Sequence, residues 1–147
     1  MKFSSTVEPQ PAELSIDQRI KFPSGLVGFT QFGEAEIIYK PEELPFMWLR
    51  GTSEGQPSFL VVEPASVVPG YEIDITDADV EALGLKNANE ALVLTIATLH
   101  RGPVNSLTLN LIGPVVVNRR TLQARQVIIG NAHKYSARHL LFETKEG

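Results

Sequence analysis

The amino-acid sequence predicts a small, mainly β domain, built on a barrel-like antiparallel or mixed sheet with one or two short helices. Leu107, Leu109 and Leu111 alternate with polar residues, a period of two that places the three leucines on one face of a strand. Three consecutive valines at 115–117 are typical of a strand buried on both faces or at a barrel corner. Residues 123–129 then indicate a returning strand after a polar turn. We therefore expect the core to be a sheet.

Length and composition place the chain among single-domain globular proteins. With 147 residues, of which 43% are hydrophobic and 20% charged, it can bury one sizeable core. No apolar run approaches the roughly 20 residues that span a bilayer, and the N-terminus lacks the pattern of a signal peptide. We therefore expect a cytoplasmic protein that has no membrane partner. The absence of cysteine excludes disulfides and thiolate zinc sites.

The charge balance bears on the kind of partner. Seventeen Asp and Glu against thirteen Lys and Arg give a net charge of −4. This excess of negative charge disfavours a surface that follows nucleic-acid phosphates. We therefore expect no direct contact with nucleic acid, and a basic partner fits better.

The first half of the chain indicates short strands joined by turns. Residues 1–14 are polar and contain prolines, so we expect a flexible arm before a single domain at residues 15–142. An edge strand is expected near residues 15–22, and the proline and glycines of FPSGLVGF then predict a turn. Further strands are expected at residues 35–39, 46–49 and 59–62. The prolines of the KPEELP linker disfavour regular structure between the first two of these strands.

The strongest helix signal begins where strand alternation gives way to helical spacing. Thr76 and Asp79 have the form of a capping box with Asp in place of the usual Glu or Gln. Acidic residues in the first turn favour the positive end of the helix dipole, and Gly84 can end the helix. One further helical turn is expected at residues 87–91.

The second half is expected to consist of paired strands. Residues 92–99 form a long β run, which the loop HRGPVN connects to the leucine strand as a hairpin. Asn110 and Asn118 flank the break in the central strand, and we expect their amides to satisfy interrupted backbone groups there. A short strand or helix is expected around residues 139–142, and residues 143–147 are expected to be frayed.

The sequence shows no constellation typical of catalysis or metal binding. Its three histidines match no common zinc spacing. Asp74, Asp77 and Asp79 lack the central glycine and distal glutamate of an EF-hand loop, which favours helix capping over calcium binding. The sequence contains neither a GxSxG nucleophile elbow nor a cysteine, so it offers no typical nucleophile for catalysis. We therefore expect no catalytic residue, no metal and no cofactor.

The residues that we expect to bind a partner are two aromatic side chains and an acidic cluster. Trp48 and Tyr71 can supply large contact areas, and core packing is the alternative role for both. The acidic cluster suits either a solvated face or contact with a basic protein. The complete set of candidates is Trp48, Tyr71, Glu72, Asp74, Asp77, Asp79 and Glu81.

Short motifs follow one another in a fixed order along most of the chain. They are Phe22, Gly25, Leu26, Gly28 and Phe29; Pro45, Phe46, Trp48 and Leu49; FLVVEP at 59–64; Pro69 and Tyr71; Thr108, Asn110, Leu111, Pro114 and Asn118; and Gln126, Tyr135, Arg138 and His139. In this order and spacing the chain resembles the flagellar assembly factors of the FliW type. One departure is Gly113, which stands where the family usually has alanine.

The resemblance implies a non-enzymatic, monomeric protein that acts by binding other proteins. Proteins of this family bind flagellin in the cytoplasm and, once flagellin has been exported, bind CsrA, a dimeric translational repressor of flagellin mRNA. Partner exchange then couples flagellin synthesis to flagellum assembly. We expect an apolar surface with Trp48 or Tyr71 at its margin and an acidic surface over residues 72–81. On CsrA the protein either blocks RNA directly or binds beside the RNA site, and the resemblance favours binding beside the RNA site.

Two other classes of function are compatible with the residues. A small-molecule-binding or hydrolytic β-barrel would need a closed pocket with convergent polar groups such as Asn110, Gln126 and His139. An RNA-binding module would need a basic or aromatic strip, for which the arginines within residues 119–125 are the only basic cluster. A solvated hairpin end is the other interpretation of these arginines.

Overall fold

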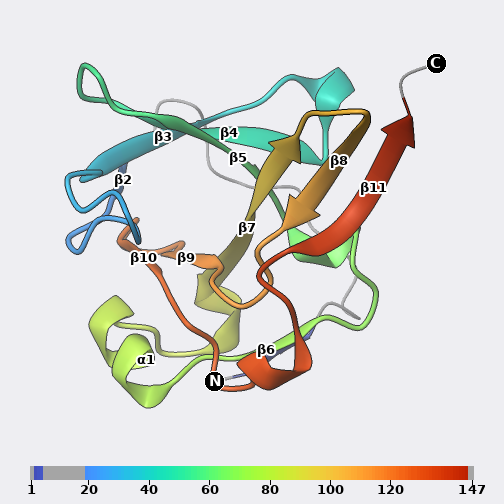
Figure 1. Ribbon diagram of the computed structural model, residues 1–147. Coiled ribbons are helices and arrows are strands. Elements are labelled where there is room, and N and C mark those ends of the chain that lie inside the picture. The colour runs from blue at the N-terminus through green and yellow to red at the C-terminus, as the bar shows by residue number, and fades with distance from the viewer. Residues whose placement is uncertain (1, 5–18, 146–147) are drawn as a thin grey trace.

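The computed structural model describes residues 2–4 and 19–145 and shows a mainly β architecture, as the sequence predicts (Figure 1). The strands are β1 Lys2–Ser4, β2 Ile20–Lys21, β3 Glu34–Ile38, β4 Phe46–Gly51, β5 Ser58–Val62, β6 Glu72–Asp74, β7 Ala91–His100, β8 Val104–Leu109, β9 Val115–Asn118, β10 Ala124–Gln126 and β11 His139–Lys145. The helix is α1 Asp77–Leu83, and the 3-10 turns are η1 Pro41–Glu43, η2 Pro64–Ser66, η3 Ala88–Glu90 and η4 Ala132–Lys134.

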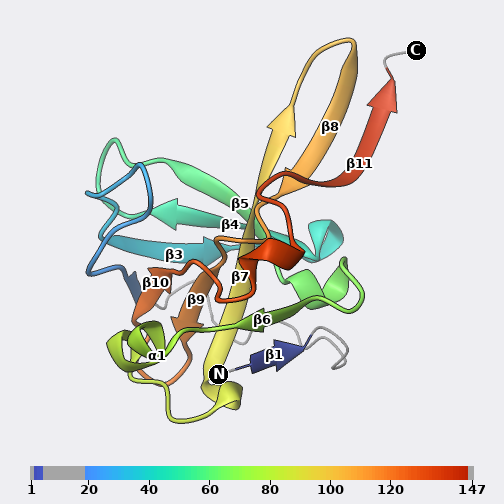
Figure 2. The same ribbon diagram turned by 60° about the horizontal axis from the view of Figure 1, so that its bottom comes forward.

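The long strand β7 organises the sheet. Its first part, residues 91–94, pairs with β9, and residues 97–100 pair with β8, while residues 95–97 pair with β5. From this strand the sheet runs through β5, β4 and β3 to β2 in one direction and through β9 to β10 in the other. β8 carries β11 on its second edge, so that β7, β8 and β11 project together from the body of the domain (Figure 2). All strand pairs in this sheet are antiparallel, and the predicted hairpin between β7 and β8 is confirmed.

The sheet does not close into a barrel, which corrects the barrel-like expectation. Its end strands, β2 and β10, have only two and three residues and meet through one isolated parallel bridge between Lys21 and Gln123. The Lys21 amide also donates to the Leu122 carbonyl at 2.9 Å. Closure needs matched strand length and stagger around the whole ring, and the side-chain alternation along one strand does not encode these quantities.

Two apolar clusters pack on the opposite faces of the sheet. Val115 and Val117 belong to one cluster and Val116 to the other, so this strand is buried on both faces as predicted. Leu107, Leu109 and Leu111 all belong to the second cluster, which confirms that the alternating leucines share a face. The aromatic residues of the first cluster include Phe22 and Phe32, whose rings lie edge to face with centroids 5.3 Å apart.

The predicted helix and its caps are confirmed. The Thr76 hydroxyl accepts from the Asp79 amide at 3.3 Å, and Gly84 ends the helix in the left-handed conformation with φ of 65°. The further turn expected at residues 87–91 is η3. None of the helices among the described residues has the length and apolar composition of a membrane span.

Several element boundaries differ from the expected ones. The strand expected at residues 123–129 is paired as a strand only over β10, and the KPEELP linker contains the short turn η1. Of the expected N-terminal arm, residues 2–4 form β1, which pairs with β6, and residues 5–14 lie outside the described part of the chain. Residues 143–145, expected to be frayed, continue β11 in register with β8.

Candidate functional site

The strand register builds one broad face across six strands. Side chains of directly opposite residues in antiparallel strands lie on the same face, so a row can be followed from strand to strand. The first row is Ile38, Trp48, Leu60, Ala97, Leu109 and His139. On β3, β4 and β5 a second row of opposite residues consists of Glu36, Arg50 and Ser58. On β7, β8 and β11 the opposite residues Leu99, Leu107 and Phe142 lie on the same face, because Leu99 and Leu107 are each two positions from members of the first row.

Part of this face is apolar and uncovered. Trp48 is 44% exposed, and Leu99 and Phe142 are each 48% exposed, whereas Leu107 and Leu109 between them are buried. We call Trp48, Leu60, Leu99 and Phe142 the open face. Four strand spacings of ~4.8 Å separate β4 from β11, so this surface is about 19 Å wide. That width accommodates an α-helix with its side chains, about 10–12 Å across.

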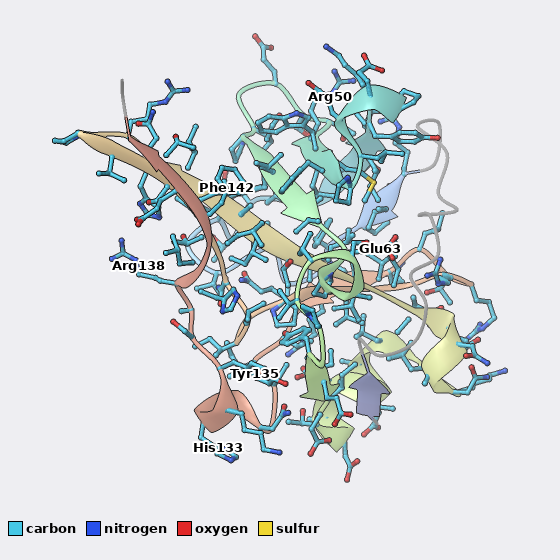
Figure 3. All side chains as sticks on the ribbon, turned by 90° about the vertical axis from the view of Figure 1, so that its right-hand side faces the viewer. Arg50, Glu63, His133, Tyr135, Arg138 and Phe142 are labelled. Carbon is cyan, nitrogen blue, oxygen red and sulfur yellow. The ribbon has the colours of Figure 1, made fainter. Side chains whose placement is uncertain are left out.

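Charged residues border the open face on both sides. Arg50 on β4 donates to the Glu36 carboxylate of β3, so its charge is compensated within the fold. Figure 3 shows Arg50 beyond β5, far from Phe142 on β11, and Arg138 projecting outward just before that strand. Arg138 is exposed and forms no ion pair with any described residue. The apolar centre and charged border are typical of a protein-binding surface.

Tyr71 lies in the core and not at a surface margin, which corrects that part of our expectation. It is 3% exposed, its hydroxyl donates to the Leu111 carbonyl, and its ring lies edge to face with Tyr135 at 4.8 Å. Burial, with a smaller contribution from Tyr135, raises the pKa of the Tyr71 hydroxyl above its ordinary value. The hydroxyl therefore stays protonated and keeps its role as a donor.

The acidic residues of the sequence cluster do not form one continuous exposed surface. Glu72 on β6 and Asp77 and Glu81 on α1 are exposed, while Asp74 is half-buried. Asp79 is 9% exposed, and its Oδ1 lies 2.8 Å from Nε of Arg125. The spacing of acidic residues along the sequence does not reveal this pairing, because Arg125 reaches α1 from β10.

Two of the polar groups suggested for a small-molecule pocket serve the backbone instead. The Asn110 Oδ1 accepts from the amides of Ile112 at 3.2 Å and Gly113 at 3.0 Å. The Gln126 Nε2 donates to the Gly113 carbonyl at 2.9 Å, and its Oε1 accepts from the Val27 amide at 3.0 Å. These amides therefore hold loops together, and their hydrogen-bonding capacity is largely used within the fold.

Asn118 has the predicted structural role at the end of β9. It is fully buried, and its Nδ2 donates to the Leu83 carbonyl at 2.8 Å, which ties the sheet to the end of α1. Its Oδ1 accepts from the amides of Arg120 at 2.9 Å and Thr121 at 3.3 Å and so organises the turn that follows.

The basic cluster after β9 is engaged in the fold. Arg120 Nε lies 2.7 Å from the Glu90 carboxylate, and Arg120 also donates to the Gly84 carbonyl. The Lys86 backbone amide and then Arg120 hold the pKa of the Glu90 carboxyl below its ordinary value. Because Arg125 is paired with Asp79, the arginines form no continuous basic strip, and this observation favours the interpretation of a hairpin end.

One carboxyl group has a strongly raised pKa. Burial raises the pKa of Glu63, at the end of β5, to about 7 against the opposing attraction of Arg119 (Figure 3). No three His, Asp or Glu side chains gather as a metal site among the residues that the structure describes. His100 Nε2 instead lies 2.9 Å from the Thr108 hydroxyl.

Leu99 and Phe142 are exposed on the open face but are not among the residues that the sequence suggested as partner contacts. The alternation of apolar residues assigns them to a face of the sheet, but it does not tell whether another element covers that face. The position of Phe142 could have indicated its exposure, because it lies in a short predicted segment near the C-terminus, where other elements are not expected to cover both faces.

Comparisons with family models, with curated proteins and with solved structures all identify the same family. The model of the family described as "FliW protein" matches residues 4–141. The Flagellar assembly factor FliW of Desulfitobacterium hafniense (strain Y51) is 37% identical over 143 residues, covering 92% of this chain and 91% of the relative. That of Geotalea uraniireducens (strain Rf4) is 36% identical, covering 91% of this chain and 82% of the relative. A crystal structure of the flagellar assembly factor FliW superposes with a TM-score of 0.76 at 26% identity and covers 97% of both chains.

Proposed function

The chain belongs to the FliW family of flagellar assembly factors, and from this premise we propose that it binds flagellin in the cytoplasm and antagonises the translational repressor CsrA. In this proposal the protein is a non-enzymatic monomer that couples flagellin synthesis to flagellum assembly. Flagellin and CsrA draw on the same pool of protein, so that occupancy by one reduces the amount available to the other.

The observation that carries the flagellin part of the proposal is the open face. A flagellin terminus is expected to be an amphipathic helix, which needs an apolar surface of helix width. Trp48 and Phe142 stand at opposite ends of the open face and are each nearly half exposed. Large aromatic side chains of this kind supply much of the binding free energy at interfaces.

The acidic part of the surface supports the CsrA part of the proposal. An RNA-binding repressor should present a basic surface, and Asp77 and Glu81 are the exposed carboxylates of α1. Asp79 is left out of this interface because Arg125 already compensates its charge. Charge complementarity of this kind raises the rate of association and decreases as salt is added.

The flagellin part is tested by calorimetric titration of cognate flagellin with Phe142→Ala and Leu140→Ala. Both residues lie on β11 with nearly equal exposure, 48% for Phe142 and 50% for Leu140. Phe142 is opposite Leu107 and belongs to the open face, whereas Leu140 is opposite Thr108 and lies on the reverse face of the sheet. We expect Phe142→Ala to weaken flagellin binding roughly tenfold or more and Leu140→Ala to leave it within about twofold. Equal losses for the two variants would refute the open face as the binding surface.

The CsrA part is tested by a gel shift of a CsrA and RNA mixture. Addition of the protein should release the RNA, and the double variant Asp77→Lys and Glu81→Lys should need a higher concentration to do so. Glu42→Lys and Glu43→Lys on η1 provide the matched charge-reversal control, since both residues are exposed and lie on another part of the molecule. If the α1 reversal has no larger effect than the η1 reversal, the acidic surface is not the CsrA site.

A further inference from the structure

A row of charged side chains continues the open face beyond Trp48. On β4 exposed and buried residues alternate, and Trp48 and Arg50 are the two exposed ones. Their side chains point to the same side of the sheet, from positions about 7 Å apart along the strand. Arg50 is opposite Glu36 on β3. Glu34 lies two positions from Glu36 and is opposite Lys21 on β2, so these side chains share that side. We call the charged residues of this surface the charge ladder: Arg19, Lys21, Glu34, Glu36 and Arg50.

Three cations of the charge ladder share two carboxylates. The Glu36 carboxylate accepts from Arg50 and also lies 3.9 Å from Nε of Arg19. The Glu34 carboxylate accepts from Lys21 and, at 3.1 Å, from Nη1 of Arg19. The hydrogen bond from Lys21 is the largest of the effects that lower the pKa of Glu34 to about 2, so this group stays ionised at neutral pH. Three positive and two negative charges give the charge ladder a net charge of +1, although the whole chain carries −4.

The guanidinium group of Arg50 lies outside the carboxylate to which it donates. The side chain of Arg50 is 54% exposed, whereas that of Glu36 is 15% exposed. The guanidinium donates only through Nη2 to Glu36 among the described residues, which leaves most of its five N–H groups free to bind a further acceptor. A partner that lies on Trp48 therefore meets the free donors of Arg50 beside the indole ring (Figure 3).

Charges of opposite sign lie on the two sides of Trp48 along the strands. Arg50 follows Trp48 in the direction of the turn after β4, where Glu54 is four positions farther on. In the other direction β3 leads into η1, and residues 40–43 there contain one lysine and two glutamates, all exposed. An acidic group of a partner is therefore attracted to the Arg50 side of Trp48 and repelled by the net negative charge near η1.

Tryptophan and arginine side by side are typical of the residues that dominate binding at interfaces. A planar guanidinium can bind one carboxylate through two parallel N–H groups. A chain of RNA phosphates fits this surface less well, because it would also approach the carboxylates of Glu34 and Glu36. The ion pair with Glu36 also restricts the Arg50 side chain before a partner arrives, which lowers the entropic cost of binding.

We propose that Arg50 binds an Asp or Glu side chain of the flagellin segment that lies on the open face, next to the apolar contact with Trp48. This inference rests on the proposed function, because flagellin is the partner assigned there to the open face. It adds the chemistry of the bound segment, an apolar stripe bordered by a carboxylate on the β4 side. The segment is thereby oriented on the sheet, since its acidic border must face Arg50.

The test measures flagellin affinity for Arg50→Gln, with Arg120→Gln as the matched control. Arg120 is also an arginine paired with one glutamate, and its side chain is 47% exposed, but it lies after β9 and away from the open face. We expect Arg50→Gln to weaken flagellin binding by roughly fivefold or more and to make it less sensitive to salt, with Arg120→Gln within about twofold of wild type. Arg50→Glu should bind more weakly than Arg50→Gln. Urea unfolding checks that each variant is folded.

A charge swap separates a contact with the partner from a role within the charge ladder. The double variant Glu36→Arg and Arg50→Glu keeps opposite charges at opposite positions of β3 and β4, but it places the carboxylate beside Trp48. We expect this variant to bind flagellin as weakly as Arg50→Glu. Recovery to within about twofold of wild type would overturn the inference, because Arg50 would then act only through the ion pair.

Other outcomes also decide against the inference. Equal losses for Arg50→Gln and Arg120→Gln would show a general effect of charge, and RNA binding that is lost in Arg50→Gln would assign the arginine to phosphate. Flagellin binding that is weakened by Phe142→Ala but not by Arg50→Gln would overturn this inference and leave the proposed function standing. Failure of the wild-type protein to bind flagellin would refute the proposed function and this inference with it.

Discussion

The hydroxyl of Tyr71 provides the clearest test of whether this residue, which the sequence suggested as a partner contact, belongs to the core. Tyr71→Phe removes one oxygen and keeps the ring, so the edge-to-face contact with Tyr135 at 4.8 Å remains possible. The substitution deletes the hydrogen bond to the Leu111 carbonyl, which lies in a buried part of the second core cluster. The expected effect is therefore on stability and not on partner binding.

The size of the effect follows from the buried carbonyl that loses its donor. Loss of one partner of a buried hydrogen bond costs about 1–3 kcal/mol, because the remaining group is left without its hydrogen bond. For a chain of this size each kcal/mol corresponds to roughly 3 °C, so we expect the midpoint of thermal unfolding to fall by about 3–9 °C. Tyr71→Ala also removes the ring and should cost about 3–5 kcal/mol.

The assay combines urea unfolding with calorimetric titration of flagellin and CsrA at a temperature at which both proteins are folded. Tyr71→Phe should shift the urea midpoint with an unchanged m-value and bind both partners like wild type. Tyr135→Phe is the matched control, because its hydroxyl accepts from the Glu72 amide at an exposed position. An unchanged urea midpoint together with weaker partner binding would refute the core assignment and make Tyr71 a contact residue.

Three further predictions concern other parts of the fold. Asn118→Ala should lower the free energy of unfolding by about 2–4 kcal/mol in urea titrations, because a fully buried amide with three hydrogen bonds is lost; a loss below about 1 kcal/mol would contradict this role. Thr76→Ala removes the acceptor for the Asp79 amide and should cost about 1 kcal/mol, whereas Thr76→Ser should retain most of the stability. The Glu63 pKa, raised from 4.5 to about 7, means that the folded protein binds more protons than the unfolded chain between these values, so its contribution to the free energy of unfolding should fall as pH rises through this window. Glu63→Gln should flatten that slope in urea titrations at several pH values, and an unchanged slope would show that Glu63 is not its source.

Local sequence signals were sufficient for the elements that depend on neighbouring residues. The alternating leucines predicted one buried face, and all three belong to one core cluster. The helix was predicted from Thr76, the acidic first turn and Gly84, and each performs its expected capping role. These features depend on backbone geometry within a few residues, which the sequence encodes directly.

Signals of the same kind were insufficient where burial depends on distant segments. Tyr71 and Trp48 are both aromatic residues proposed to contact a partner, yet Tyr71 is 3% exposed and Trp48 is 44% exposed. The difference arises because Tyr135, from the end of the chain, packs on Tyr71, while Trp48 faces the uncovered part of the sheet. Asp79 likewise belongs to the acidic cluster in sequence but is paired with Arg125 in space.

Local patterns along the chain were enough to establish the mainly β class, the capped helix, the structural amides and, through the order of the motifs, the family of this protein. Packing between segments far apart in the chain leaves the sheet open, leaves some apolar side chains uncovered and compensates some of the charges. The open face, for example, joins residues of β4, β5, β7 and β11, which are up to about ninety positions apart in the sequence. The physical reason is that side-chain periodicity sets the direction of a residue within its own element, while exposure and charge pairing depend on the other elements that pack against it.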